Sequence, residues 1–325
     1  MRGAADIAAA APGGVPGTAS PATTARARLA AIAVIVAGIA SIAGIAGCAP
    51  ASGAAPAART SNRISYYLSL GDSLSRGMQP DSAGTMIPTG EGYANQLYAQ
   101  LRPGDPGLRL VKLGCSGETT TTMINGGKCR YPSGSQLAQA ASFLRGHRGE
   151  VSLITIDIGS NDLDADLNAC ESRSSFAAIM SCLGRGVPGL LANLTKIMTT
   201  LRSAAGSQVR VIGMSYYDPM LTQWRYGVLG QTEARLSEQI VSSLNRLLAG
   251  VYQAYGARVA NVFGAFDSAD FSGSVNLPGF GAVPPNVAAI CRWTWDCAPP
   301  PRGPNIHADT AGYRVIARAF LSADH

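Results

Sequence analysis

The residue best placed for covalent chemistry is a serine at the end of a short apolar stretch. Ser73 lies within Leu68–Leu74 (LSLGDSL), where an expected buried strand stops at Gly-Asp-Ser. A serine hydroxyl is a weak nucleophile unless a base takes its proton and N–H groups face the developing oxyanion, and a strand-to-helix turn can supply both. The sequence therefore indicates nucleophilic acyl transfer, although Asp and Ser after Gly are also ordinary capping or turn residues. Ser75 stands where a Gly-x-Ser-x-Gly turn has its second glycine, which disfavours an α/β-hydrolase.

Three other short motifs follow Ser73 along the chain. Gly117 lies in GCSGET, Asn161 in GSND and His307 in NIH, in that order. Together the four blocks resemble the SGNH (GDSL) hydrolase family, in particular exported bacterial esterases and lipases with three disulfides. The resemblance runs from about Ile64 to the last expected helix.

The resemblance implies a role for each of these residues. Ser73 Oγ would attack an acyl carbonyl, and the oxyanion would be held by the N–H groups of Ser73 and Gly117 and the side-chain amide of Asn161. A glycine at position 117 lets the backbone approach a substrate closely. Taken alone, Gly117 would be a turn glycine and Asn161 an Asx turn or a helix cap before Asp162.

The general base is identified by elimination. The chain has three histidines, of which His325 is the last residue and His147 lies in an exposed-looking connection. His307 remains, just before the expected final helix, in a loop suited to reaching across the carboxyl ends of the strands. We therefore predict that His307 is the base for Ser73.

The group that orients this histidine is missing from its usual position. In the family an Asp three residues before the histidine fixes the imidazole tautomer, and here that residue is Pro304. We expect a main-chain oxygen near Pro304 to orient His307 in a Ser–His dyad, without the electrostatic support of a carboxylate. The competing hypothesis takes a carboxylate from Asp296 or Asp309, although Asp309 is well placed to cap the final helix.

Short apolar strands alternate with amphipathic helices along the chain. Strands are expected over 65–70, 108–113, 151–158, 209–214 and 257–262, and helices over 92–101, 136–144, 187–201, 236–251 and 310–321. This alternation predicts an α/β fold with a parallel sheet covered on both faces, here a flavodoxin-like three-layer α/β/α arrangement with about five central strands. Ligands bind outside the carboxyl ends of such strands, and Ser73, Gly117 and Asn161 each follow one.

Residues 1–47 have the features of an export signal of the lipoprotein type. A basic, Ala- and Pro-rich start precedes an apolar run over 29–47, which ends at the lipobox-like sequence Ile-Ala-Gly-Cys48. Such a cysteine is lipidated and becomes the first residue of the mature protein. Residues 48–62, rich in Ala, Ser, Gly and Pro, would form a flexible linker to a hydrolase domain over 63–325.

Two alternatives stay open for the N-terminal segment. The apolar run is long enough to be an uncleaved membrane span. Signal peptidase could instead cleave at a small-residue site near Ala49 or Ala51 and release the protein. We expect an extracytoplasmic protein, either held at the membrane by a lipid anchor on Cys48 or secreted.

Cysteine spacing supports export independently. Six cysteines remain when Cys48 is set aside, and six allow 15 connectivities. Spacing favours three local pairs within loops, where cross-links leave a sheet undistorted: Cys115–Cys129, Cys170–Cys182 and Cys291–Cys297. Free buried thiols are the alternative. There is no Cys-x-x-Cys motif and no His pair, so a metal site has little support.

Charge gives a weaker indication of partners. The formal net charge is +6, and residues 1–47 account for three basic residues and one acidic residue, which leaves about +4. No basic cluster with interleaved aromatic residues suggests nucleic acid. We expect an ester or lipid substrate, no cofactor, no metal, no nucleic acid and a monomer.

Aromatic residues near the histidine are candidates for the substrate pocket. Trp293 and Trp295 lie between the last two cysteines, where they would either line an acyl pocket or only pack their loop. Tyr216, Tyr217 and the segment 220–226 follow the fourth strand and are further candidates for the wall.

Three functions are weighed on this basis. The first is an exported serine esterase or lipase that hydrolyses carboxylic esters through an acyl-enzyme intermediate. The second is a polysaccharide O-acetyl deacetylase on the same fold, and the third is a catalytically silent lipoprotein that binds glycan or lipid. The complete set of Ser, Gly, Asn and His argues against the third, and acyl preference would separate the first two.

Overall fold

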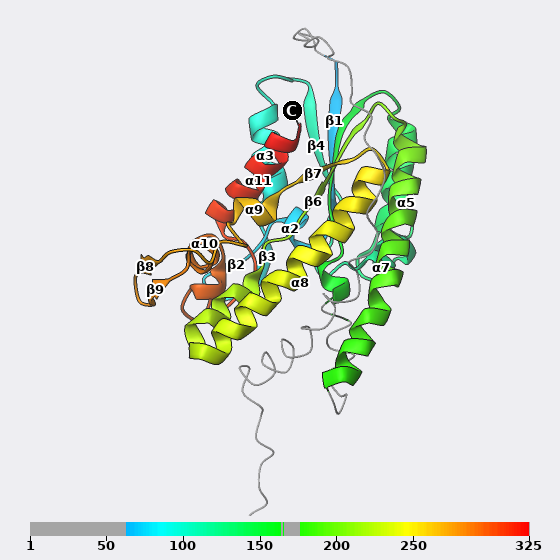
Figure 1. Cartoon of the computed structure of the whole chain (residues 1–325). Coiled ribbons are helices and arrows are strands. Elements are labelled where there is room, and N and C mark those ends of the chain that lie inside the picture. The colour runs from blue at the N-terminus through cyan, green and yellow to red at the C-terminus, as the bar shows by residue number, and fades with distance from the viewer. Residues whose placement is uncertain (1–62, 164, 166–175, 325) are drawn as a thin grey trace, which may run out of the picture.

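A five-stranded parallel sheet forms the centre of the molecule (Figure 1). The computed structural model describes residues 63–163, 165 and 176–324. The sheet has the order β4-β1-β5-β6-β7, and every neighbouring pair is parallel. Its strands are β1 Ser65–Gly71, β4 Leu108–Lys112, β5 Val151–Asp157, β6 Arg210–Met214 and β7 Arg258–Ala260. The predicted α/β fold with about five central strands is confirmed.

Helices cover both faces of this sheet (Figure 1). Helices α3, α9 and α11 lie on one side, and α5, α7 and α8 on the other. The helical segments are α2 Ser73–Arg76, α3 Tyr93–Leu101, α4 Thr120–Asn125, α5 Gln136–Gly146, α7 Phe176–Ala205, η2 Pro219–Tyr226, α8 Gly227–Ala254, α9 Val262–Ala265, α10 Pro285–Trp293, η3 Trp295–Cys297 and α11 Thr310–Asp324. Because strand side chains on either face are covered, strands such as β5 (VSLITID) are nearly continuous apolar runs.

The last sheet strand is shorter than predicted. The strand expected over 257–262 is β7, which ends at Ala260, and Val262 already begins α9. The side chain of Asn261 caps that helix by accepting a hydrogen bond from the N–H of Gly264 at 2.9 Å. The cap therefore ends the strand before its apolar run does.

Two small antiparallel hairpins were not predicted. One pairs β2 Met78–Pro80 with β3 Met86–Pro88, and the other pairs β8 Val275–Leu277 with β9 Gly281–Val283. Each strand has three residues, too few to show an alternating pattern. Both hairpins lie outside the central sheet.

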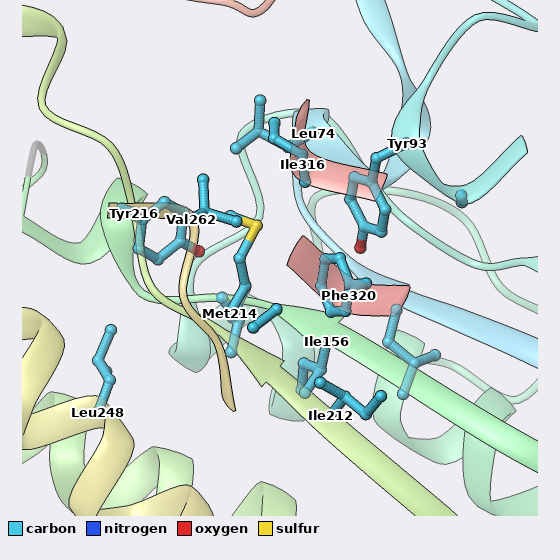
Figure 2. Packing of buried hydrophobic residues seen from close by; sticks show 14 of the residues in the cluster. Leu74, Tyr93, Ile156, Ile212, Met214, Tyr216, Leu248, Val262, Ile316 and Phe320 are labelled. Carbon is cyan, nitrogen blue, oxygen red and sulfur yellow. The ribbon is translucent and has the colours of Figure 1, made fainter. Parts of the chain in front are cut away.

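The core lies between the sheet and its two helical layers (Figure 2). On one face the rings of Tyr93 in α3 and Phe320 in α11 stack with centroids 4.7 Å apart. Both side chains are fully buried, as are Ile156 and Met214 of the sheet. These contacts hold α3 and α11 firmly against the strands that carry the candidate site.

The described part of the chain begins just before β1. Arg63 precedes the amino end of this strand, and Ser73 follows its carboxyl end. The predicted signal peptide over 1–47, Cys48, the linker over 48–62 and the side chains of Cys170 and Cys182 lie outside what the structure describes. In the described part of the chain, no helix is long and apolar enough to cross a membrane.

Candidate active site

The turn after β1 holds Ser73 at the start of a short helix. Gly71 has a φ of 131°, and a Cβ there would lie 2.2 Å from the main-chain oxygen of Asp157 on the neighbouring strand. Glycine is therefore required for β1 to pass so close to β5. Asp72 caps α2 by accepting from the N–H of Leu74 at 2.9 Å, which leaves Ser73 as the first helical residue.

The loop after β4 packs directly beside this turn. The N–H of Cys115 donates to the oxygen of Gly71 at 3.0 Å, and a Cβ on Gly114 would lie 2.1 Å from Ser75 Oγ. Gly117 itself has a φ of 73°, a conformation that side chains other than glycine rarely adopt. The side chain of Lys128 packs against Gly117, since a Cβ on Gly117 would lie 2.9 Å from Lys128 Nζ.

The helical turn that begins at Ser160, after β5, completes the group. Asn161 Nδ2 donates to the main-chain oxygen of Glu118 at 2.9 Å, and Ser160 Oγ donates to Asp72 Oδ2 at 3.1 Å. The carboxylate of Asp162 accepts from the N–H of Thr120 at 2.8 Å, at the start of α4. The structure thus brings the predicted residues Ser73, Gly117 and Asn161 together on three segments that are hydrogen-bonded to one another at one edge of the sheet.

Two main-chain donors at this edge are unused. Within the described part of the chain, neither the N–H of Ser73 nor that of Gly117 has a hydrogen-bond acceptor. The side-chain amide of Asn161 carries two N–H groups and uses one of them on Glu118. Unpaired N–H groups are the donors that an oxyanion needs.

His307 reaches the serine from the loop before α11. Its Nε2 lies 2.9 Å from Ser73 Oγ. The loop is fixed on both sides, because Trp295 N–H donates to the oxygen of His307 at 3.0 Å and Tyr217 OH donates to the oxygen of Ile306 at 2.7 Å. The predicted serine and histidine are therefore within hydrogen-bond distance.

The side chain of Asn305 sets the tautomer of His307. Asn305 Oδ1 lies 3.0 Å from the main-chain N of His307 and 2.8 Å from its Nδ1. A main-chain N–H can only donate, so the atom that it meets must be the amide oxygen. Nδ1 therefore carries the imidazole proton, and Nε2 keeps the lone pair that accepts from Ser73 Oγ–H.

This arrangement corrects the expectation about the orienting group. The acceptor for Nδ1 is the Asn305 side chain, not a main-chain oxygen near Pro304, because a side chain two residues before the histidine folds back in an Asx turn. Neither carboxylate alternative takes this position. Asp296 accepts from Thr222 Oγ1, and Asp309 caps α11 by accepting from the N–H of Gly312 at 2.7 Å.

Burial without a carboxylate partner keeps His307 neutral. Removal from solvent lowers the pKa of His307 from its ordinary value of 6.5 to about 4. Between these values the unfolded chain binds more protons, so the stability that this group contributes is complete above pH 6.5 and is lost as pH falls through 4. Through the neutral range Nε2 is therefore free to accept a proton.

Changing Asn305→Asp is expected to move the acid limb of the pH–rate profile. In the wild type the limb of kcat/KM should fall near pH 4, since His307 loses basicity only there. A carboxylate next to Nδ1 should raise the pKa of His307 by about one to three units and shift the limb upward by that amount. The measurement is kcat/KM for a neutral ester across pH 3–8, within the range where each variant stays folded. Asn305→Ala is the control, with lower kcat and an unshifted limb, and an unshifted limb in Asn305→Asp would contradict the contact.

Asp296→Asn and Asp309→Asn should each lower kcat by less than about tenfold. Neutralising the Asp of a working triad costs roughly 10⁴, whereas these carboxylates contact Thr222 and the start of α11. The loss in Asp309→Asn should appear mainly as stability, about 1 kcal/mol or less, because asparagine also caps helices. Turnover and melting temperature, measured for each variant, test this. A loss near 10⁴ in either would mean that a carboxylate completes the triad.

Three of the aromatic residues proposed for the pocket wall have partners within the protein. Trp295 Nε1 donates to Gln79 Oε1 at 3.3 Å, and the ring of Trp293 meets that of Phe266 edge-on at 5.2 Å. Tyr216 OH lies 3.4 Å from the carboxylate of Asp72. These contacts account for the three side chains as packing, and a part in acyl binding stays a prediction.

A buried carboxyl pair beneath the nucleophile was missed from the sequence. Asp157 Oδ2 accepts from the main-chain N–H groups of Asp72 and Ser75, at 3.4 and 3.2 Å, on either side of Ser73. Burial, and then the charge of Asp72, raise the pKa of Asp157 well above its ordinary value. The two main-chain hydrogen bonds to Asp157 fix the turn that carries Ser73. An aspartate closing the apolar run VSLITID is the signal that could have revealed it.

Two disulfides are present at the site. Cys115–Cys129 ties the loop that carries Gly117, and Cys291–Cys297 closes the segment that holds Trp295 beside His307. Both were predicted from spacing. Each disulfide fixes a segment that carries or contacts a candidate site residue. The third predicted pair, Cys170–Cys182, stays a prediction.

Comparison with known families agrees with this geometry. Residues 69–315, well over half of the chain, match the model of the GDSL-like lipase/acylhydrolase family. The chain belongs to this family. The matched segment of this GDSL hydrolase contains Ser73, Gly117, Asn161 and His307. No match was found among curated proteins.

Solved structures similar to this GDSL hydrolase have low sequence identity to it. An extracellular lipase from Streptomyces rimosus is 18% identical with a TM-score of 0.51, covering 80% of this chain and 100% of its own. The lipase Lip_vut3 from a goat rumen metagenome is 16% identical with a TM-score of 0.49, covering 80% and 97%. The acetylxylan esterase Axe2 from Geobacillus stearothermophilus is 17% identical with a TM-score of 0.46, covering 80% and 94%. The similarity to the Streptomyces rimosus lipase concerns the fold alone.

Proposed function

We propose that this protein is a serine esterase or lipase that hydrolyses carboxylic esters through an acyl-enzyme intermediate. The observation that carries the proposal is the 2.9 Å contact between Ser73 Oγ and the unprotonated Nε2 of His307, beside two unused N–H groups. A nucleophile, its base and oxyanion donors in one place are the requirements for acyl transfer. Family membership supports the same reaction class.

The geometry suggests a sequence of proton movements. Ser73 Oγ attacks the ester carbonyl as His307 Nε2 takes its proton, and the N–H groups of Ser73 and Gly117 with the amide of Asn161 stabilise the oxyanion. His307 then gives the proton to the leaving alcohol, which leaves the acyl group on Ser73. A water molecule attacks this ester as His307 Nε2 takes its proton. The bond between Ser73 Oγ and the acyl group then breaks, His307 returns the proton to Oγ, and the acid departs. Asn305 keeps Nδ1 protonated throughout by accepting its hydrogen bond.

A panel of p-nitrophenyl esters from acetate to palmitate tests the proposal. Hydrolysis that depends on Ser73 is expected, and the acyl length with the highest kcat/KM gives the substrate class. Restriction to acetate, together with release of acetate from acetylated polysaccharide, would favour the deacetylase alternative. Absence of turnover on every ester would contradict the esterase proposal and favour the catalytically silent binding protein.

We further propose that the enzyme is exported and anchored through lipid on Cys48. The lipobox-like sequence supports the anchor, and two disulfides support an oxidising compartment. Cys48→Ser should block processing or move the protein out of the membrane fraction. An unmodified mature N-terminus in an intact-mass measurement would refute lipidation.

A further inference from the structure

Large apolar side chains are exposed where η2 passes into α8. The exposed fractions are 56% for Tyr226, 81% for Val228 and 54% for Leu229, and Phe280 at the β8–β9 hairpin is 38% exposed. We call these four residues the tip patch. Soluble monomers expose single apolar residues routinely, but several together mark a surface that contacts an apolar phase or a partner.

Two arginines lie over aromatic rings in and beside the tip patch. Arg225 Cζ is 5.5 Å from the ring centre of Tyr226 and 4.7 Å from that of Phe280, so it joins η2 to the β8–β9 hairpin. Arg235 lies in the same way over Trp224 and Phe271, at 5.1 and 4.6 Å. The Asp296 carboxyl, whose pKa burial raises, lies near enough to Arg225 for the arginine charge to oppose that rise, whereas Arg235 is exposed. The surface therefore combines apolar side chains with the positive charge of Arg235.

The tip patch is joined to the histidine loop. Thr222 of η2 donates to the carboxylate of Asp296, which lies beside Trp295, and Tyr217 just before η2 donates to the oxygen of Ile306. Ile306 is 46% exposed and directly precedes His307. Figure 1 shows the start of α8 and the β8–β9 hairpin on the same side of the molecule as the β2–β3 hairpin, whose Met86 contacts Asn305.

We propose that the tip patch docks the enzyme on an anionic phospholipid surface. The proposal rests on the proposed function, since docking there would bring lipid esters to the edge that carries Ser73. A lipid surface is favoured over a protein partner because the apolar side chains project, Val228 most of all, and the exposed Arg235 can meet lipid phosphates. Apolar side chains that enter the headgroup region, flanked by basic residues, are typical of interfacial attachment to anionic membranes.

A tryptophan placed in the patch reports docking directly. The full chain carrying Leu229→Trp, with Ser73→Ala to prevent hydrolysis, is mixed with phosphatidylglycerol or phosphatidylcholine vesicles whose acyl chains are brominated. Brominated phosphatidylglycerol should quench the added fluorescence roughly twofold, because the side chain enters the acyl boundary. Phosphatidylcholine should quench it much less. The matched control is Gln239→Trp, an exposed position further along α8, which should show no added quenching.

The charge contribution has its own matched pair. Arg235→Gln in the Leu229→Trp background should raise the vesicle concentration for half-maximal quenching by about fivefold, whereas Arg246→Gln removes the same charge further along α8 and should not. The N-terminal segment is common to all variants, so an anchor there does not change the comparison. Equal quenching at positions 229 and 239, or none at 229, overturns the proposal. So does a fluorescence change without vesicles that grows with protein concentration, which would assign the patch to a second copy. Ester hydrolysis is measured separately, so the proposed function fails only if the p-nitrophenyl esters are not cleaved.

Discussion

Ser73→Ala is expected to lower ester hydrolysis by a factor on the order of 10⁶ while the melting temperature changes little. The acyl-enzyme cannot form without Oγ. The hydroxyl makes one hydrogen bond to the described chain, to His307 Nε2, and its loss leaves no buried donor unpaired. Initial rates on a p-nitrophenyl ester and a thermal melt provide the two measurements.

Ser116→Ala is the matched control for this variant. Ser116 is an exposed serine on the adjacent loop, one residue before Gly117, and its removal should leave kcat unchanged. An organophosphonate should label Ser73 in the wild type and nothing in Ser73→Ala. Labelling of any other serine would show that the nucleophile is misassigned.

Asn161→Ala should lower kcat by about 10² to 10³ with little change in KM. One N–H of the amide is spent on the oxygen of Glu118, which holds the side chain in place, and the other is available for the oxyanion. A donor that acts on the developing charge stabilises the transition state more than the bound ester, so the loss appears in kcat.

The controls for Asn161 separate catalysis from loop structure. Asn161→Asp keeps the shape but replaces the donor with a negative charge, so its loss should be at least as large as that of the alanine variant. Asn193→Ala removes an amide that contacts Thr120 and Thr121 nearby and should leave kcat unchanged. Wild-type turnover in Asn161→Ala would return this residue to a role in holding the Glu118 loop.

The sheet was predictable because its strands are buried on both faces and therefore appear as continuous apolar runs. Three motifs that each follow such a run had to meet at one edge, so the order of Ser73, Gly117 and Asn161 along the chain was enough to place them together. The position of Ser73 also depends on Gly71, where β1 passes too close to β5 for any side chain. A single sequence shows that glycine but not the strand beside it.

The orienting residue of His307 was out of reach for a different reason. The family pattern directs attention to position 304, where proline stands. The contact comes instead from Asn305, through an Asx turn that the sequence alone does not distinguish from other turns. The spacing Asn-x-His is the signal to examine in similar chains. The tip patch was equally hidden, since apolar residues such as Val228 and Leu229 at the start of an amphipathic helix are expected to be buried.

The polarity of β1 has a consequence for an enzyme tethered at Cys48. The chain enters the domain at the amino end of β1 and Ser73 lies beyond the other end, so seven residues of strand, about 23 Å, separate the attachment point from the chemistry. A fully extended segment over 48–62 reaches about 50 Å at most, which exceeds that length. If Cys48 carries the proposed lipid, this segment is therefore long enough for the domain to turn over and present the edge that carries Ser73 to the anchoring bilayer. On that proposal, shortening the segment should reduce hydrolysis of lipid esters in the anchoring membrane before it affects hydrolysis of dissolved esters.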